Sequence, residues 1–149
     1  MRKLVFIGGM SWVSTRIYYE WINRLVQRRT QPMASAPLLI ESLDFAQLYG
    51  LHEADDWARA AQVLGESARR LEAAGAGAIV IAANSMHKVY DDVAAQVDVP
   101  ILHIAECVGR RMKADGVDSA ALFGTRNVMT ENFYRRRLVA HGVDLLPLD

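Results

Sequence analysis

The chain has 149 residues, of which 52% are hydrophobic, and its 17 basic residues balance its 17 acidic ones. This length suits one ordinary domain or one and a half small ones, and the apolar content is enough for a folded core. A formally neutral chain offers no electrostatic basis for binding nucleic acid or an anionic membrane surface.

The sequence shows neither a targeting segment nor a metal-binding motif. The apolar N-terminal stretch breaks at Gly8-Gly9, which is too early for a signal-peptide core, and no apolar run approaches the roughly 20 residues of a membrane helix. We therefore expect a soluble, cytoplasmic protein. A single cysteine, Cys107, rules out an internal disulfide and a thiolate metal cluster, and the four scattered histidines lack the spacing of a zinc motif.

Short apolar runs alternate with longer amphipathic stretches along the chain. The runs resemble strands of a parallel sheet that is covered on both faces, and the amphipathic stretches repeat apolar residues at the three- and four-residue steps of a helix. In the first half, the elements expected in chain order are a strand over 4–7, a helix over 17–26, a strand over 38–43, a helix from Asp55 to Gly75-Gly77 and a strand over 79–81.

The second half continues the same pattern. Its expected elements are a helix over 84–97 capped by Asn84-Ser85, a strand over 101–104, a helix through Val108 and Met112 to Gly116, a strand over 120–123, a helix begun by Thr130 and a strand over 143–146. Strict alternation predicts an α/β fold, with a parallel sheet, helices on both of its faces and right-handed crossovers. The last unit would have little cover, so it either packs against the first four strands or begins something longer.

Ligands of an open parallel sheet bind beyond the carboxyl ends of its strands. Four such ends stand out, at residues 8–11, after Leu43, at 83–87 and at 124–126. Three of them join glycine or small polar residues to a helix start, where free N–H groups bind carboxylates and phosphates. The sequence therefore favours a small anionic ligand. A dinucleotide is disfavoured, because Gly8-Gly9 lacks the third glycine of that fingerprint.

Several of these residues also have purely structural explanations. Asn84 and Ser85 could serve only as a helix cap, and His87 falls where a structural hydrogen bond is the commoner role. The three arginines at 135–137 are expected to form a solvated helix face. Cys107 is expected to be a buried small hydrophobe, and the three tryptophans are expected to pack rather than to bind a ligand.

Four segments taken together resemble the aspartate/glutamate racemase family. They are IGGMSW at residues 7–12, IVIAANSMHKVY at 79–90, PILHIA at 100–105 and LFGTRNVMTENFY at 122–134. The likeness is nearest to the bacterial broad-specificity amino-acid racemases that act on aspartate and glutamate. It implies two pseudo-symmetric lobes, with residues 1–115 as the first lobe and residues 116–149 as the beginning of the second.

The resemblance also implies a chemistry that needs no pyridoxal phosphate or other cofactor. Members of the family use two cysteines on opposite sides of the substrate α-carbon, and one thiolate removes the α-proton while the other thiol delivers a proton. Ala83 stands where the first cysteine belongs, and the second would lie beyond this chain; Cys107 matches neither position. The resemblance therefore implies an isomerase that is catalytically disabled as it stands. An engineered change and a natural loss at position 83 are both open.

Substrate-binding positions are implied by the same motifs. Met10 would line the site from the first loop, Asn84 and Ser85 would hold the substrate carboxylate, and Thr125 would contribute from the second lobe. His52 falls where related sequences place a polar side chain, which is a weaker match. The ligand would be a small amino acid or dicarboxylate. The family also implies a homodimer, and the aromatic-rich first helix either supplies an interface or packs on the sheet.

Two other kinds of function stay open. One is a non-catalytic binding module that kept the pocket and lost the chemistry. The other is a different enzyme of the superfamily, a decarboxylase or a cis–trans isomerase, since a decarboxylase can work with a single cysteine on the second lobe. The pairing of Met86 with His87 looks more like the racemase branch.

Overall fold

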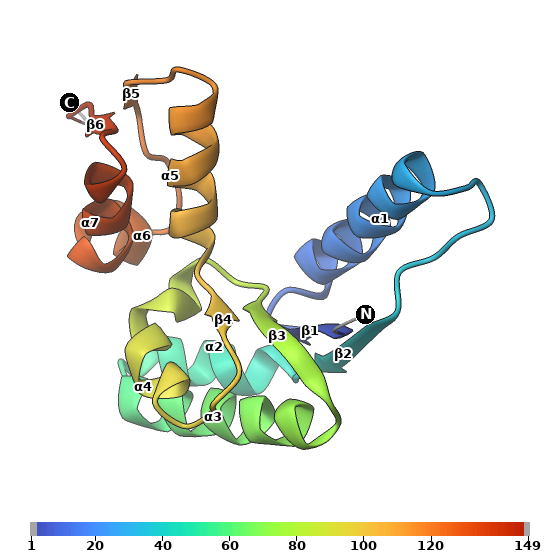
Figure 1. Ribbon diagram of the computed structural model, residues 1–149. Helices are drawn as coiled ribbons and strands as arrows, with labels where there is room; N and C mark the ends of the chain where they lie inside the picture. The colour runs from blue at the N-terminus through green and yellow to red at the C-terminus, as the bar shows by residue number, and fades with distance from the viewer. Residues whose placement is uncertain (1–2, 148–149) are drawn as a thin grey trace.

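The computed structural model describes residues 3–147, which form two α/β units (Figure 1). The larger unit contains a four-stranded parallel sheet in the order β2-β1-β3-β4. Its strands are β1 (Lys3–Gly8), β2 (Leu38–Ser42), β3 (Ala76–Ile81) and β4 (Ile101–Leu102). All three strand pairings are parallel, which confirms the α/β parallel fold that the alternating pattern predicts.

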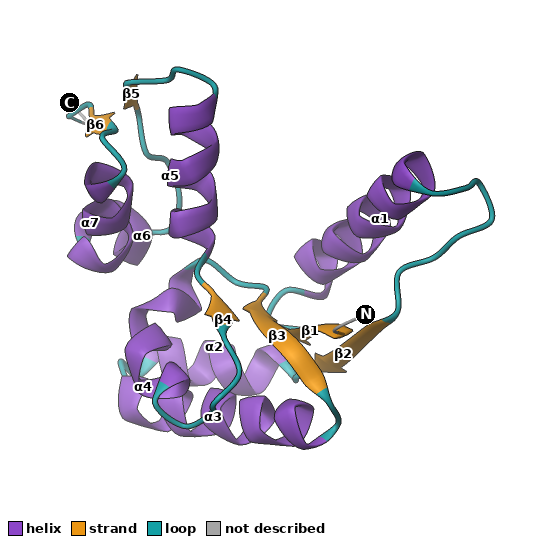
Figure 2. Cartoon of the chain, viewed as in Figure 1, coloured by secondary structure: helices purple, strands orange, loops and turns teal. Residues whose placement is uncertain are grey.

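Helices lie on both faces of the larger sheet (Figure 2). On one face lies α1 (Trp12–Arg29), whose Tyr18 ring meets that of Phe6 in β1 at a centroid distance of 5.9 Å. On the other face lie α2 (Phe45–Glu53), α3 (Trp57–Ala73) and α4 (Tyr90–Ala94). The acidic start expected for α3 is confirmed, because Asp56 accepts a hydrogen bond from the Arg59 N–H at 3.0 Å.

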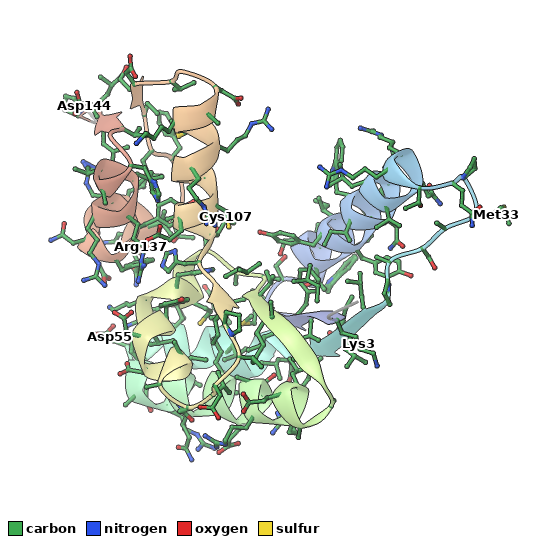
Figure 3. The ribbon with its side chains drawn as sticks, viewed as in Figure 1. Lys3, Met33, Asp55, Cys107, Arg137 and Asp144 are labelled. Atoms are coloured by element: carbon green, nitrogen blue, oxygen red, sulfur yellow. The ribbon has the colours of Figure 1, made fainter. Side chains whose placement is uncertain are left out.

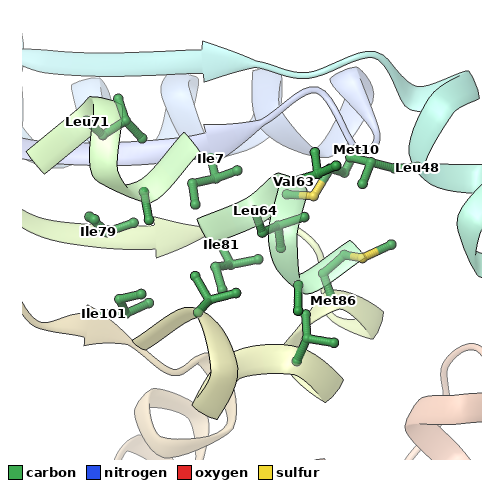
Figure 4. Close-up of a cluster of buried hydrophobic side chains, with 14 of the residues drawn as sticks. Ile7, Met10, Leu48, Val63, Leu64, Leu71, Ile79, Ile81, Met86 and Ile101 are labelled. Atoms are coloured by element: carbon green, nitrogen blue, oxygen red, sulfur yellow. The ribbon is translucent and has the colours of Figure 1, made fainter. Parts of the chain in front are cut away.

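An apolar core holds α3 against the sheet (Figure 4). Ile7 and Ile81 point from the strands toward Leu64 of α3, and all three side chains are fully buried. Burial of side chains of this size stabilises the fold by about 1.5–3 kcal/mol each. Met10 and Met86 extend the same core past the carboxyl ends of β1 and β3, so the segments that follow these strands are anchored there.

Several expected elements differ in the structure, among them the strand expected over 120–123, which is Ser119–Ala120. The helix expected over 84–97 is a 3-10 helix, η1 (Ser85–Val89), followed by the short α4, and Asn84 makes no side-chain cap hydrogen bond. The strand expected over 101–104 ends at Leu102, because His103 begins the next helix by accepting a hydrogen bond from the Ala105 N–H. Thr130 ends a helix instead of beginning one, because the backbone of Glu131 is extended and the next helix begins at Asn132.

A smaller sheet belongs to the second unit, where β5 (Ser119–Ala120) pairs in parallel with β6 (Asp144–Leu145). Its helices are α5 (Ile104–Ala114), α6 (Arg126–Thr130) and α7 (Asn132–Ala140). Their shared core consists of Ala105, Val128, Tyr134, Leu138 and Val143. Residues of α5 pack in this core, and the expected boundary between the lobes at residue 115 stays a prediction.

Charged side chains join the two units at the junction of α7 and α4, where Figure 3 places Arg137. Arg137 donates to Glu106 at 2.9 Å and to Asp91 at 3.3 Å, and its guanidinium lies 4.9 Å from the centroid of the Tyr90 ring. The prediction of a solvated face is wrong for this arginine, which is only 19% exposed. Its neighbours on α4 and α5 could not be known from the arginine run alone.

Exposed aromatic residues characterise α1. Trp12 and Trp21 are 67% and 52% exposed, so the prediction that the tryptophans pack is wrong for these two, whereas Trp57 packs against the larger core. Only Thr15 of α1 is buried, because the helix meets the sheet near its first turn and then diverges from it (Figure 1). Within residues 3–147, no helix combines the length and apolar character needed to cross a bilayer.

Candidate active site

The segments that follow β1, β2 and β3 converge on a cavity of about 390 Å³. Its lining consists of Met10, Ser11, Ser14, Tyr18, Phe45, Leu48, Tyr49, His52, residues 82–86 and Thr125. All six site positions suggested by the sequence are in this list, so the structure brings them together. They come from four separate parts of the chain, as expected for a site at the carboxyl edge of a parallel sheet.

Gly9 allows the first loop to approach the segment after β2. Its φ angle is +80°, in the left-handed region that glycine tolerates, and a Cβ atom there would overlap the backbone of Leu43. Two hydrogen bonds set the loop in place. The Leu43 N–H donates to the Gly8 carbonyl at 2.9 Å, and the Gly9 N–H donates to the Thr15 hydroxyl at 3.0 Å.

His87 holds the segment around Ala83. The Ile104 N–H donates to its Nε2 at 3.3 Å, so the ring proton resides on Nδ1, which donates to the Ala83 carbonyl at 2.9 Å. Burial lowers the pKa of His87 below its usual range, which keeps the ring neutral. The structural role expected for this histidine is confirmed, and it also links the segment after β3 to the start of α5.

Ser85 and Thr125 meet across the two units. Their hydroxyl oxygens are 2.9 Å apart, although 40 positions separate the residues in sequence. Thr125 precedes α6 without making a side-chain cap hydrogen bond, and Asn84 likewise makes none. These three polar side chains are therefore not committed to capping their own helices, and Asn84 and Ser85 directly follow Ala83 on the same short segment.

No thiol reaches this cavity from the described residues. Ala83 contributes only a methyl group to the lining, and Cys107 lies on α5 (Figure 3), a helix that contributes no residue to the lining. The expectation of a buried Cys107 is wrong, because the thiol is exposed. The face of α5 that packs in the second core carries Ile104, Val108 and Met112, and Cys107 lies off that face.

Met10 and His52 line the cavity in different ways. Met10 is 6% exposed and belongs to the larger core, so only a small part of its side chain faces the cavity. His52 projects from α2 and meets the ring of Trp57 edge-on at a centroid distance of 5.4 Å. Its Nδ1 has no hydrogen-bond partner within residues 3–147 and lies 3.6 Å from the Glu53 carboxylate.

Phe45 and Tyr49 are lining residues that the sequence did not suggest. Both lie on α2, a helix absent from the expected elements, although Asp44 offered a start signal that the structure uses by accepting a hydrogen bond from the Ala46 N–H. Tyr18 joins them from α1, and burial raises the pKa of its phenol. The lining in the described part of the chain is therefore apolar, aromatic or neutral and polar, apart from the imidazole of His52.

A racemase family model matches this architecture. The Asp/Glu/hydantoin racemase model aligns with residues 7–146, which is nearly the whole chain and includes every lining residue of the cavity. The chain belongs to this racemase family. The family resemblance found in the four sequence motifs is thereby confirmed.

Solved structures support the same assignment. A proposed Asp/Glu racemase from Yersinia pestis is 42% identical, with a TM-score of 0.93 over 100% of this chain and 65% of its own length. An aspartate racemase homologue from Pyrococcus horikoshii OT3 is 32% identical, with a TM-score of 0.85 over 100% of this chain and 66% of its own. This racemase-family chain thus spans about two thirds of the length of these relatives.

A more distant structure extends the likeness of the fold. The aspartate racemase of Picrophilus torridus is 16% identical, with a TM-score of 0.74 over 98% of this racemase-family chain and 62% of that protein. At this identity the match supports the α/β architecture alone. The first two relatives therefore carry the family assignment together with the family model.

Proposed function

We propose that this chain binds an amino acid by its α-carboxylate, in the manner of a racemase-family site, without carrying out α-proton transfer. The observation that supports this is the contact of Ser85 with Thr125, 2.9 Å apart beside Ala83 in the shared cavity. Two hydroxyls and the neighbouring Asn84 amide can donate several hydrogen bonds to one carboxylate, and such charge-assisted bonds are stronger than neutral ones.

Ala83 determines the chemistry that this proposal allows. Racemisation without a cofactor needs one group that removes the α-proton and another that returns a proton to the opposite face. The methyl group of Ala83 can do neither, and the Cys107 thiol lies outside the cavity. The substrates implied by the family likeness are aspartate and glutamate, which makes them the first compounds to test for exchange.

Hydrogen exchange at the α-carbon tests the missing chemistry. We expect no loss of the α-proton signal when either enantiomer of aspartate or glutamate is incubated with the chain in D₂O and followed by NMR. The substitution Ala83→Cys in this same chain is expected to leave each enantiomer uninverted, because inversion needs a second proton donor on the opposite face and no other thiol lines the cavity within residues 3–147. Exchange above the buffer rate in the unmodified chain would overturn the proposal of a disabled site.

Chemical-shift mapping tests the binding half of the proposal. An amino acid titrated into the ¹⁵N-labelled chain should move the amide signals of Ala83, Asn84, Ser85 and Thr125. Ser85→Ala should weaken binding by about tenfold, since a hydrogen bond to a charged group contributes roughly 1.5–3 kcal/mol. Signals that move only in distant parts of the chain would contradict the assignment of the cavity.

The second candidate is a binding protein whose natural form also lacks the racemase chemistry, and Ala83 is the observation that favours it. Both candidates predict binding without exchange by this chain. They differ in the natural gene, where codon 83 specifies cysteine if the alanine was introduced and alanine if the chemistry was lost in nature. Sequencing that codon separates the two.

A further inference from the structure

One wall of the cavity is a row of aromatic rings on α2. Phe45, Tyr49 and His52 are spaced four and three residues apart, so they lie on the same face of the helix. The rings of Phe45 and Tyr49 have centroids 5.5 Å apart, and those of Tyr49 and His52 are stacked at 6.3 Å. We call these three side chains the aromatic row.

The aromatic row lines the cavity while retaining much exposed surface. Phe45 is 48% exposed and Tyr49 is 50% exposed, and both are in the cavity lining. Leu48, on the next face of α2, is in contrast buried in the core. Leu48 therefore anchors α2 in the core, and the three rings of the aromatic row are available to contact a ligand in the cavity.

The chemistry of this wall selects against a second carboxylate. The face of an aromatic ring carries the negative end of the ring quadrupole, which attracts the positive edges of other rings and disfavours an anion. A carboxylate placed there would lose water, the faces of the Phe45 and Tyr49 rings would give it no charged partner, and the neighbouring Glu53 adds a like charge 3.6 Å from His52 Nδ1. A different segment of the lining, at Asn84 and Ser85, supplies hydrogen-bonding groups.

We infer that the aromatic row is the side-chain subsite, and that it selects amino acids with a neutral aromatic side chain over aspartate and glutamate. This rests on the proposed function, because the α-carboxylate is held at Ser85 and Thr125 while the side chain extends toward α2. Tyr49, the middle ring of the row, is the main specificity-determining residue. The ligand class is a free α-amino acid such as phenylalanine.

Dissociation constants measured by NMR titration of the ¹⁵N-labelled chain test the inference. The ligands are phenylalanine, aspartate and asparagine, each as both enantiomers; asparagine has the size of aspartate without its side-chain charge. We expect phenylalanine to bind about tenfold more tightly than aspartate, since offset aromatic contacts and ring burial are available only to it. Asparagine should bind at least as tightly as aspartate.

Substitution of the middle ring gives the second measurement. Tyr49→Ala should weaken phenylalanine binding by about tenfold and leave aspartate binding within about twofold. The matched control is Tyr19→Ala, because Tyr19 is also 50% exposed but lies on α1 outside the cavity lining. The control variant should bind all three ligands as the unmodified chain does.

The outcomes separate this inference from the proposed function. If aspartate moves the signals of Ala83 to Ser85 and binds as tightly as phenylalanine, the specificity inference is wrong and the proposed function stands. Tighter binding of aspartate than of asparagine, or a preference for phenylalanine that survives Tyr49→Ala, also overturns the inference. If no amino acid moves those signals, both are overturned.

Discussion

His87 and His103 are buried polar residues at the junction of the two units. Their rings meet edge to face at a centroid distance of 4.5 Å, and His103 lies against the Tyr90 ring at 4.7 Å. His103 Nδ1 accepts from the Ala105 N–H at 3.1 Å, so its proton resides on Nε2, which has no hydrogen-bond partner within residues 3–147. Both rings are therefore held neutral, and protonating either one works against the fold.

Acid should destabilise the chain through His103. Burial lowers its pKa from the ordinary 6.5 to about 3, with His87 and Arg137 adding to the shift. Because the pKa in the folded state lies below that in the unfolded chain, the stabilisation is complete above about pH 6.5 and is lost as the pH falls toward about 3. We expect the free energy of unfolding, measured with urea, to fall across this range.

The substitution His103→Asn isolates this contribution. Asparagine retains an oxygen that can accept the Ala105 N–H, so the start of α5 is preserved while the titrating ring is removed. Glu106, whose pKa is lowered by hydrogen bonds from His141 and Arg137, also loses stabilising pairs in acid, but it does so equally in both proteins. The variant should lose less stability than the unmodified chain between pH 6.5 and pH 4, and an unchanged pH dependence would contradict the explanation.

At the scale of elements, the site depends on how the segments after β1 and β2 pack together. The β1–α1 loop and the start of α2 touch at Gly9 and Leu43, and this contact places α2 beside the cavity. The segment after β3 is held separately, through His87 and the burial of Met86. Two independent attachments therefore bring the aromatic row and the Ala83 segment to the same space.

Gly9→Ala should disrupt the first of these attachments. Alanine would have to adopt a φ angle of +80° and would overlap the Leu43 backbone, so we expect a loss of about 2–4 kcal/mol in the free energy of unfolding. Gly75→Ala is the matched control, because its φ is +88° and a Cβ atom would meet nothing within 4 Å. Its loss should be about 1 kcal/mol. Equal losses would show that packing against Leu43 contributes little.

At the scale of the whole molecule, β4 and α5 connect the two apolar cores along the chain (Figure 1), and the ion pairs of Arg137 add a second connection. The first turn of α1 is attached to the larger sheet, and the rest of the helix extends away from it (Figure 1). Its outer surface carries Trp12, Tyr19 and Trp21, each at least half exposed. Such a surface suits contact with another protein surface.

We propose that α1 takes part in a homodimer. Size-exclusion chromatography with light scattering should give twice the mass of one chain, and Trp21→Glu should shift the mass to that of a monomer. Phe123→Glu is the control, because Phe123 is 77% exposed but lies in the second unit. A monomeric mass for the unmodified chain would contradict the proposal, and a dimer that survives Trp21→Glu would place the interface elsewhere.

Local patterns in the sequence determined the fold class and the rough position of the site. The spacing of apolar residues reflects the backbone geometry of strands and helices, so β1, β2, β3, α1 and α3 were all expected. The rule that ligands bind at the carboxyl ends of parallel strands, together with the family motifs, pointed to Met10, His52, Thr125 and residues 83–85, and all of them line one cavity. The same motifs identified the family.

Contacts between distant segments were decided only by the tertiary structure. The meeting of Ser85 with Thr125, the packing of α5 with α7, the burial of Arg137 and the exposure of Cys107 each depend on which helix lies next to which. A local pattern states that a helix has an apolar face, but not which partner covers that face. Phe45 and Tyr49 belonged to no expected element, and only the approach of α2 to the Ala83 segment made them part of the candidate site.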